Sequence, residues 1–339
     1  PKMFSVVVNE LSRSGSAKGA RVVVEKPFGR NLKSAKALNV VLLKVFPEDA
    51  IFRIDHFLGK EAVQNLLYFR FANSFFEPIW NASFIDRVEI TMAEDFGVKG
   101  RGKLYEDTGA IRDVVENHLL QVVASLAMDV PNPNEVESLR DARSKLLEAI
   151  VPLTPKDIVR GQFVGYHDEK DVSPTSTVET YAAVKLAIDS PRWKGVRFFI
   201  RAGKCLPITR TEVMVVLKPL SPFSDSKSET KDHANHVRFR LDPKMEIGLG
   251  LRTKASGEGM HGHEIELLVT EKDTDAMTPY ERLLGDAMAG DATLFARQDA
   301  VEAEWRVVDG VLDNVTPIHP YAQGSWGPAE AEQVLPKFT

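Results

Sequence analysis

The feature that most constrains the fold is a series of strand-like segments in the second half of the chain. Each is a short run rich in β-branched and aromatic residues, and polar turns separate one run from the next. The segments are 158–166, 180–188, 196–202, 212–218, 236–241, 246–252 and 264–270. Such a series is typical of an antiparallel sheet. The sequence therefore predicts a large, mostly antiparallel sheet.

A different pattern occupies residues 1–55. "ARVVVEKPFG" (20–29) indicates a buried strand that stops at a Pro-Phe-Gly turn, and "AIFRI" (50–54) indicates a second strand. Between them, "NLKSAKALNVVLLKVF" indicates a helix with Asn31 as its N-cap. Strand, helix and strand in this order predict a parallel βαβ unit with a right-handed crossover. We expect the tail of a parallel α/β domain in residues 1–55 and an α+β domain in residues 56–339.

Helical patterns lie mainly between these two regions. They occur in "KEAVQNLLYFRFA" (60–72), "GAIRDVVENHLLQVVASLAM" (109–128) and "NEVESLRDARSKLLEAI" (134–150). A strand pattern lies between the first two, at 84–94. The second of the helical patterns predicts one long, continuous helix with an apolar stripe.

The composition excludes several functions. The net charge is -5 and the pI is near 6.0, so the chain lacks the basic footprint of a nucleic-acid-binding protein. It has no apolar run of about 18 residues, which argues against a membrane span. The lone cysteine, Cys205, indicates a reducing compartment, and we expect a cytoplasmic protein.

The stretch "RIDHFLGKE" (53–61) joins the second strand to the next helix. Asp55 lies just past the carboxyl end of that strand, where open α/β sheets bind ligands. His56 and Lys60 lie near a helix start, and with free backbone N–H groups they would form a pocket for a dianion such as a phosphate ester. The alternative is a solvated lysine beside a capping histidine.

His118 lies on the apolar stripe of the long predicted helix. An inward-facing histidine needs a partner, and it is either a satisfied core residue or a general base oriented by a carboxylate. Asp55 is the candidate carboxylate. Asp113 on the same helix would lie roughly 140° from His118 if the helix were ideal, so the two would not act side by side.

Further charged residues follow predicted strands. Glu94, Lys204 and Arg210 do so, and such residues are usually solvated. Lys26 differs, because it precedes Pro27 at the tip of a buried strand, where the Lys–Pro bond could be cis. "MHGHE" (260–264) suggests a metal only weakly, because it lacks an evident third ligand.

Together these stretches resemble the glucose-6-phosphate dehydrogenase family. The similarity extends over essentially the whole chain, and the motifs occur in the order found in that family. They are "RIDHFLGKE", "VVVEKPFG", "IRDVVENHLLQ", "RAGKCL" and "PYAQGSWGP". The resemblance implies oxidation of glucose 6-phosphate at C1 to the 1,5-lactone, with NADP, or alternatively NAD, as the cofactor. It also implies a homodimer or homotetramer.

The resemblance implies a role for each candidate residue. His118 would take the C1 hydroxyl proton and Asp55 would orient it, much as the acid of a catalytic triad does. His56 and Lys60 would hold the phosphate. Glu94, Asp113 and Lys204 would bind the sugar, with Arg210 nearby. Lys26 would contact both the sugar and the nicotinamide end of the cofactor.

Two departures from the family pattern stand out. Phe57 occupies a position where the family usually has Tyr, so a phenolic donor to the phosphate is missing. Residues 1–55 would match only the C-terminal remnant of the family's Rossmann domain, without its glycine fingerprint. We therefore expect that the chain as given binds sugar phosphate but turns over poorly or not at all.

Two rival functions remain open from the sequence. One is a sugar oxidoreductase of the glucose–fructose oxidoreductase type, which also carries an "EKP" turn but needs no phosphate grip. The other is an inactive fragment that only binds sugar phosphate.

Overall fold

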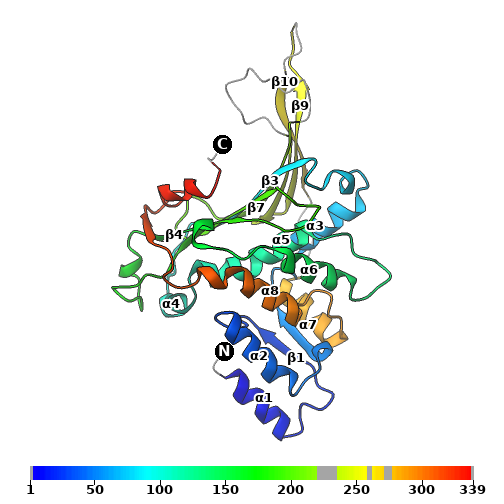
Figure 1. Cartoon of the computed structure of the whole chain (residues 1–339), viewed down its shortest axis with the longest axis vertical. Coiled ribbons are helices and arrows are strands. Elements are labelled where there is room, and N and C mark those ends of the chain that lie inside the picture. The colour runs from blue at the N-terminus through cyan, green and yellow to red at the C-terminus, as the bar shows by residue number, and fades with distance from the viewer. Residues whose placement is uncertain (1–2, 220–234, 258–261, 271–276, 337–339) are drawn as a thin grey trace. The chain divides into compact units, whose positions relative to one another are not determined.

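The computed structural model describes residues 3–219, 235–257, 262–270 and 277–336 (Figure 1). It divides into two compact units, each made of three chain segments. Unit 1 combines Pro1–Leu67, Ile111–Pro155 and Asp275–Val315, and unit 2 combines Tyr68–Ala110, Lys156–Thr274 and Thr316–Thr339. The expected domain boundary at residues 55 and 56 follows chain order, whereas these units interleave along the chain.

Unit 1 contains the predicted βαβ unit. Strands β1 (Val22–Glu25) and β2 (Ile51–Ile54) pair in parallel, and helix α2 (Leu32–Leu43) connects them. The side chain of Asn31 accepts a hydrogen bond from the backbone N–H of Ser34, which confirms the predicted N-cap. Helix α1 (Phe4–Arg13) precedes this unit and was not predicted.

Strand β2 is buried along its whole length. Phe52 and Ile54 pack against Leu283 and Phe295. The guanidinium of Arg53, between them, is neutralised in a bidentate pair, with its nitrogens 2.6 and 3.0 Å from the carboxylate oxygens of Glu48. These contacts fix the strand end from which the next residues project.

The helix predicted for residues 109–128 begins at Ile111 and continues to Ala127, with π geometry over its first 9 residues. Helix α4 (Gly102–Ala110) ends in a kink at Gly109, whose φ is 65°. A Cβ at Gly109 would lie 2.4 Å from the carboxylate of Glu179, so only glycine fits there. A π-helix, η3 (Ile111–Leu119), follows and leads into α5 (Leu120–Ala127).

The other helices and the short 3₁₀ segments complete the described elements. Helices α3 (Glu61–Ala72), α6 (Ser138–Ala149), α7 (Pro279–Ala289) and α8 (Gln298–Val308) are the longer ones. The 3₁₀ segments are Glu48–Ala50, Glu77–Ile79, Pro155–Asp157, Tyr166–Asp168, Asp309–Val311 and Ala329–Gln333. In unit 1, α8 packs against α2, α6 and η3, which ties the βαβ unit to the π-helix.

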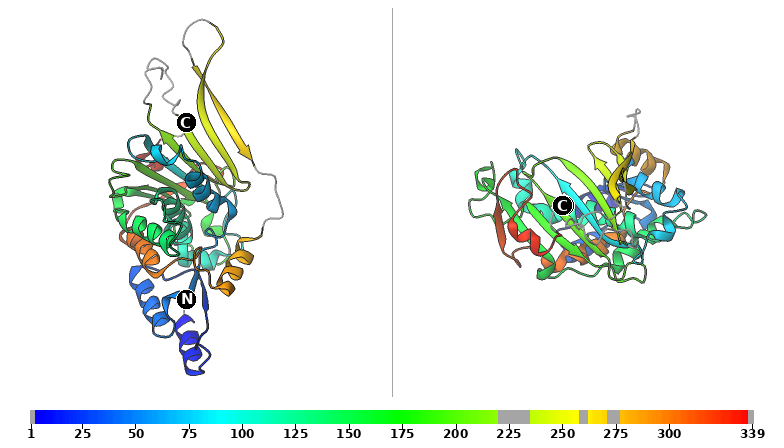
Figure 2. Two further views of the ribbon diagram at one scale, coloured as in Figure 1. Left: turned by 90° about the vertical axis from the view of Figure 1, so that its right-hand side faces the viewer. Right: turned by 90° about the horizontal axis from the view of Figure 1, so that it is seen from above.

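Unit 2 is built on one large sheet, which has nine strands among the described residues (Figures 1 and 2). In spatial order they are β10 (Gly262–Thr270), β9 (Glu246–Lys254), β8 (His236–Asp242), β7 (Arg210–Leu217), β3 (Ile85–Ala93), β6 (Arg197–Gly203), β5 (Tyr181–Leu186), β4 (Ile158–Phe163) and β11 (Ile318–Tyr321). Within this sheet, only β3–β6 and β4–β11 are parallel among the strand pairs of the described residues. The prediction of a large, mostly antiparallel sheet is confirmed, although β11 was missed.

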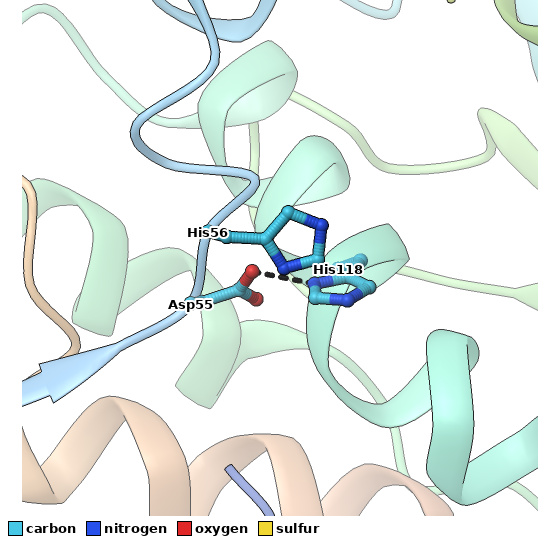
Figure 3. A group of neighbouring side chains, drawn as sticks. All are labelled: Asp55, His56 and His118. Atoms are coloured by element: carbon cyan, nitrogen blue, oxygen red, sulfur yellow. Dashed lines mark hydrogen bonds and ion pairs between the residues drawn. The ribbon is translucent and has the colours of Figure 1, made fainter. Parts of the chain in front are cut away.

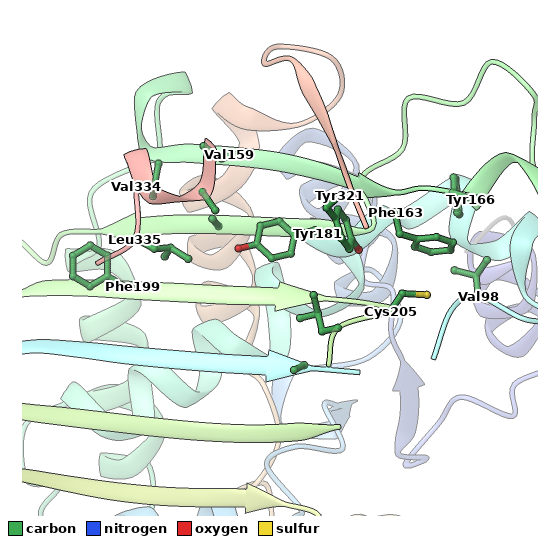
Figure 4. Close-up of a cluster of buried hydrophobic side chains, with 14 of the residues drawn as sticks. Val98, Val159, Phe163, Tyr166, Tyr181, Phe199, Cys205, Tyr321, Val334 and Leu335 are labelled. Atoms are coloured by element: carbon green, nitrogen blue, oxygen red, sulfur yellow. The ribbon is translucent and has the colours of Figure 1, made fainter. Parts of the chain in front are cut away.

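One face of this sheet carries an aromatic core (Figure 4). Phe163, Tyr166, Tyr181 and Tyr321 are buried in it. The hydroxyl of Tyr321 donates to the backbone oxygen of Lys204 at 2.7 Å. The core therefore fixes the turn that follows β6.

Among the described residues, none of the helices combines the length and the apolar character that crossing a bilayer requires.

Candidate active site

Asp55 directly follows β2 and is 2 % exposed. Its Oδ1 accepts a hydrogen bond from the backbone N–H of Phe57 at 2.9 Å. The same oxygen lies 2.5 Å from Nδ1 of His118, a residue 63 positions later in the chain. Figure 3 shows the carboxylate projecting from the strand end toward the imidazole on η3. The structure thus brings together the acid and the histidine that the sequence predicted as a pair.

The protonation states of this pair follow from burial and charge. Burial alone would raise the pKa of Asp55, but the attraction of His118 and Lys26 outweighs it and lowers the pKa to about 2. Burial lowers the pKa of His118, although Asp55 opposes that shift. At neutral pH the pair is therefore a carboxylate and a neutral imidazole. Because the carboxylate is an acceptor, Nδ1 carries the ring proton and Nε2 has the free lone pair.

The ammonium of Lys26 faces the lone pair on Nε2 of His118. Lys26 Nζ lies 2.7 Å from this nitrogen and donates to the backbone oxygen of Asp113 at 2.8 Å. The carboxylate of Asp113 lies 4.0 Å from the same Nζ. The Lys26–Pro27 peptide bond is cis, as the sequence allowed.

The separation of roughly 140° predicted between Asp113 and His118 does not apply to this helix. That prediction assumed an ideal α-helix, whereas residues 111–119 form a π-helix. Each backbone bond of a π-helix spans five residues, so residues five apart lie closer to one face than they would in an α-helix. Asp113 and His118 are five apart, and Lys26 contacts both of them.

His56 and Phe57 contact the ring of His118, and Lys60 lies over the ring of Phe57. The His56 ring lies 4.5 Å from the His118 ring, edge to face, and the Lys60 ammonium lies 4.3 Å from the centre of the Phe57 ring. Phe57 in turn stacks on His118 at 4.3 Å. Burial and the nearby His118 lower the pKa of His56 to about 4, so His56 is neutral and offers an N–H donor at neutral pH.

Asp55, His56 and His118 each offer a ligand atom within 4.8 Å of the others. They nevertheless fit a metal ion poorly. Asp55 and His118 already satisfy one another, and the Lys26 ammonium lies against the remaining imidazole nitrogen. A further cation would meet repulsion there. Of the weaker "MHGHE" pattern, His261 lies outside the described residues.

The remaining predicted residues lie at one edge of the sheet in unit 2. Glu94 follows β3 and Lys204 follows β6, its parallel neighbour. The Lys204 ammonium is buried, and it lies 2.5 Å from the carboxylate of Glu94, which is partly exposed. Arg210 pairs with Ala93 at the start of β7, so it lies at the same edge. Its side chain is 38 % exposed and lies 3.9 Å from Glu212.

Sequence reasoning missed several polar neighbours of the pair in unit 1. Asn117 Oδ1 accepts the backbone N–H of His118 at 2.7 Å, and Glu116 is buried beside it. Tyr280 stacks on His56 with its ring centre 6.0 Å away. A single Glu or Tyr within a helical pattern usually faces solvent, so the sequence carried no signal for these residues.

The fold and this site define a class of protein. A parallel βαβ unit with an acid–histidine pair at its carboxyl edge, accompanied by a large antiparallel sheet, fits a nucleotide-dependent oxidoreductase that binds its ligands at that edge. The family model "Glucose-6-phosphate dehydrogenase, NAD binding domain" matches residues 1–65, and "Glucose-6-phosphate dehydrogenase, C-terminal domain" matches residues 67–338. The chain belongs to the glucose-6-phosphate dehydrogenase family.

Individual relatives agree with this assignment. Glucose-6-phosphate 1-dehydrogenase 1 of Mycobacterium bovis is 42 % identical over 337 residues, covering 99 % of this chain and 72 % of the relative. The enzyme of Aggregatibacter actinomycetemcomitans is 41 % identical over 363 residues, with the same two coverages. A crystal structure from Mycobacterium avium superposes with a TM-score of 0.90 at 43 % identity, covering 98 % of this chain and 72 % of that one.

Two further structures mark the range of similarity. A glucose-6-phosphate dehydrogenase in complex with glucose 6-phosphate has a TM-score of 0.90 at 34 % identity, covering 99 % of this chain and 72 % of that one. KijD10, a 3-ketoreductase from Actinomadura kijaniata, has a TM-score of 0.53 at 10 % identity over 94 % of this chain and 76 % of its own. The second similarity shows the fold alone.

The βαβ unit has two features of a dinucleotide-binding unit. Lys26 and Asp55 follow the carboxyl ends of β1 and β2, where sheets of this type bind ligands. Gly29 has a φ of 129°, and a Cβ there would lie 2.8 Å from the backbone nitrogen of Ala35. Glycine therefore allows α2 to approach the end of β1 closely, as dinucleotide-binding units require.

Proposed function

We propose that Asp55 and His118 are the catalytic pair of a glucose-6-phosphate 1-dehydrogenase, which oxidises glucose 6-phosphate at C1. The observation that carries this assignment is the buried 2.5 Å contact between Asp55 and His118 Nδ1, which leaves Nε2 as a base. Membership of the family supports the reaction class, an NADP-dependent oxidation in the oxidative pentose phosphate pathway.

His118 Nε2 takes the proton of the C1 hydroxyl. This atom faces the ammonium of Lys26, so the hydroxyl must replace that contact. Lys26 can remain on the backbone oxygen of Asp113 while it turns toward the sugar. Asp55 stabilises the imidazolium that forms, because its carboxylate already faces Nδ1.

Loss of the proton and of a hydride converts C1 to the carbonyl carbon of 6-phosphoglucono-1,5-lactone. NADP, when bound, accepts the hydride, and Lys26 is the residue of this chain that would contact its nicotinamide end. The Asp55–His118 pair removes the hydroxyl proton, so that the oxygen can form the carbonyl as the hydride departs.

His56 and Lys60 would hold the phosphate. Lys60 supplies a positive charge, and neutral His56 supplies an N–H donor whose pKa a bound dianion would raise. Asp113, Glu94 and Lys204 would bind sugar hydroxyls, with Arg210 as a further polar contact.

A direct assay tests this function. Purified chain is mixed with glucose 6-phosphate and NADP, and NADPH formation is followed by absorbance, with NAD tested in parallel. We expect turnover that is slow and that depends on the phosphate group. Equal turnover of free glucose would favour an oxidoreductase of the glucose–fructose type. Calorimetric binding of glucose 6-phosphate without turnover would instead favour a binding fragment.

The assembly and compartment are proposals of the same kind. Family membership supports a homodimer or homotetramer in the cytoplasm. Light scattering on the purified chain tests the first, and fractionation of cells tests the second.

A further inference from the structure

Two buried carboxyl groups of unit 1 have no part in the mechanism described above. Glu116 lies on η3, two residues before His118, and Glu304 lies on α8, which packs against η3. Both side chains are almost fully buried, at 5 % and 2 % exposed. Buried acids without a basic partner are rare, because ionisation in a low-dielectric interior is costly.

Each of these two carboxyl groups is held by an amide rather than by a cation. Oε2 of Glu116 accepts from Nδ2 of Asn117 at 3.3 Å. Oε1 of Glu304 accepts from Nε2 of Gln121 at 2.6 Å. Amide donors tolerate both the neutral and the ionised acid, so this arrangement is compatible with a change of protonation.

Glu116 is connected to His118 through Asn117. Asn117 Nδ2 donates to the Arg112 backbone oxygen at 2.9 Å as well as to Glu116, and Asn117 Oδ1 accepts from the His118 backbone N–H. These bonds join positions 112, 116, 117 and 118 of the π-helix. A change at Glu116 therefore reaches the backbone that carries His118.

Charged groups act on this acid pair from several elements. They are Lys26 after β1, Asp55 after β2, Arg112 on η3 and Arg143 on α6. Burial raises the pKa of Glu116 to about 8, and the Asp55 carboxylate adds to that shift while Lys26 and Arg112 oppose it. Burial, together with the neighbouring Glu116, raises the pKa of Glu304 well above its ordinary value.

We propose that Glu116 is a positioning residue for His118 and that it holds a proton whose release adds a negative charge near the Asp55–His118 pair, with Glu304 as the neighbouring acid that opposes this release. The proposal rests on the assignment of His118 as the base. With the proton in place, Asp55 is the ionised carboxylate beside His118. When the proton leaves, the added charge stabilises the imidazolium and makes His118 a stronger base.

Nuclear magnetic resonance of ¹⁵N-histidine-labelled chain tests this without any turnover. The imidazole shifts of His118 are followed from pH 6 to 10 in the substrate-free protein, with His118→Asn used to assign the signal. We expect an inflection near pH 8 in the unsubstituted chain. Glu116→Gln keeps an acceptor for Asn117 but cannot ionise, so the inflection should disappear.

Two further variants sharpen the test. Glu304→Gln should move the inflection to lower pH, because a competing carboxyl group is lost. Glu148→Gln changes an exposed glutamate of α6 and should leave the curve unchanged. An inflection that persists in Glu116→Gln, or that is absent from the unsubstituted chain, overturns the proposal.

Infrared spectroscopy provides an independent readout if Glu116→Gln does not fold. The carbonyl band of a protonated, buried carboxyl group should be present at pH 6 and weaken above pH 8 in the unsubstituted chain. Glu304→Gln should shift this loss to lower pH, and an unchanged band overturns the proposal. Because both methods use the substrate-free chain, their failure is distinct from a failure of the NADPH assay.

Discussion

The acid–base pair of unit 1 and the charged sheet edge of unit 2 are built differently. Asp55 and His118 are each 2 % exposed and are contacted by neighbours that set their charge states. At the sheet edge, Lys204 is buried but its partner Glu94 is partly open to solvent, and Arg210 is more exposed still. In the first region, burial and neighbouring charges fix the protonation states of the two side chains. In the second region, polar groups remain accessible to a ligand.

This difference indicates a division of labour. Groups that move protons need a controlled environment, because a small change in pKa alters the rate. Groups that bind hydroxyls need accessible hydrogen-bonding atoms held in place by a rigid frame. Substitutions of the Asp55–His118 pair should therefore act mainly on kcat, and substitutions at the sheet edge should act mainly on KM.

The largest effect is expected for His118→Asn. The amide can still donate to Asp55, but no base remains at the position of Nε2, so kcat should fall by up to about 10⁴-fold. Steady-state kinetics measures this. His56→Asn is the matched control, because it removes the neighbouring imidazole and should raise KM instead. A kcat within tenfold of the unsubstituted chain would contradict the assignment.

Asp55→Asn should have the next largest effect. An asparagine amide no longer fixes the Nδ1–H form of His118 and cannot stabilise the imidazolium, so kcat should fall by about 10²–10³-fold. The far-downfield proton signal of a short Nδ1–H bond should also vanish from the NMR spectrum. If that signal is lost while kcat is kept, Asp55 has only a structural role.

The sequence predicted much of this molecule for physical reasons. Runs of Val, Ile and Phe such as "VRFFIRA" favour strands wherever they pack, so the sheet strands were found. Asp55 and His118 were predicted as partners because one follows a buried strand and the other lies on an apolar stripe. A polar side chain at either position is expected to be buried, and a buried polar side chain needs a hydrogen-bond partner.

The parts that were missed depend on tertiary contacts. A π-helix has no hydrophobic period of its own to read, and here Lys26 and the Asn117 side chain bond backbone oxygens at its start. The burial of Glu116 likewise depends on α8, which lies far away in sequence. Strand β11 has four residues, one of them Pro320, too few for a periodic pattern.

At the sheet edge, Lys204→Met should separate binding from catalysis. It removes a buried, charged donor worth about 1.5–3 kcal/mol, so KM for glucose 6-phosphate should rise roughly 10- to 100-fold while kcat changes little. Lys185→Met is the control, because that lysine is 41 % exposed and lies on neighbouring β5. A fall in kcat as large as that of Asp55→Asn would abolish the distinction between the two regions.

Stability in acid should also report on unit 1. The pKa of Asp55 is about 2 in the folded chain against an ordinary value of 3.8, so the folded state favours the carboxylate. This contribution is fully present above pH 4 and is lost as the pH falls through 2, which amounts to about 2 kcal/mol.

Denaturant unfolding measured between pH 5 and 2 checks this expectation. Asp55→Asn should lose less stability over that range than the unsubstituted chain, by about the same 2 kcal/mol. Asp189→Asn changes an exposed aspartate and should show the full loss. Equal acid sensitivity of all three proteins would mean that Asp55 is not held as an anion.

The smallest effect is expected for Phe57→Tyr, which tests whether a residue beside the base also serves binding. The ring stacks on His118 and lies under the Lys60 ammonium, so an added hydroxyl would enter the proposed phosphate pocket. A hydrogen bond to a charged group contributes about 1.5–3 kcal/mol, and burying the hydroxyl offsets part of this gain. KM for glucose 6-phosphate should therefore fall by up to about tenfold, with kcat unchanged. Phe57→Leu, which loses the stacking and adds no donor, should not lower KM. If KM for the tyrosine variant is unchanged or raised, the phosphate does not bind beside this ring. Phe57 would then belong only to the catalytic region, and phosphate binding would have to be assigned to other residues.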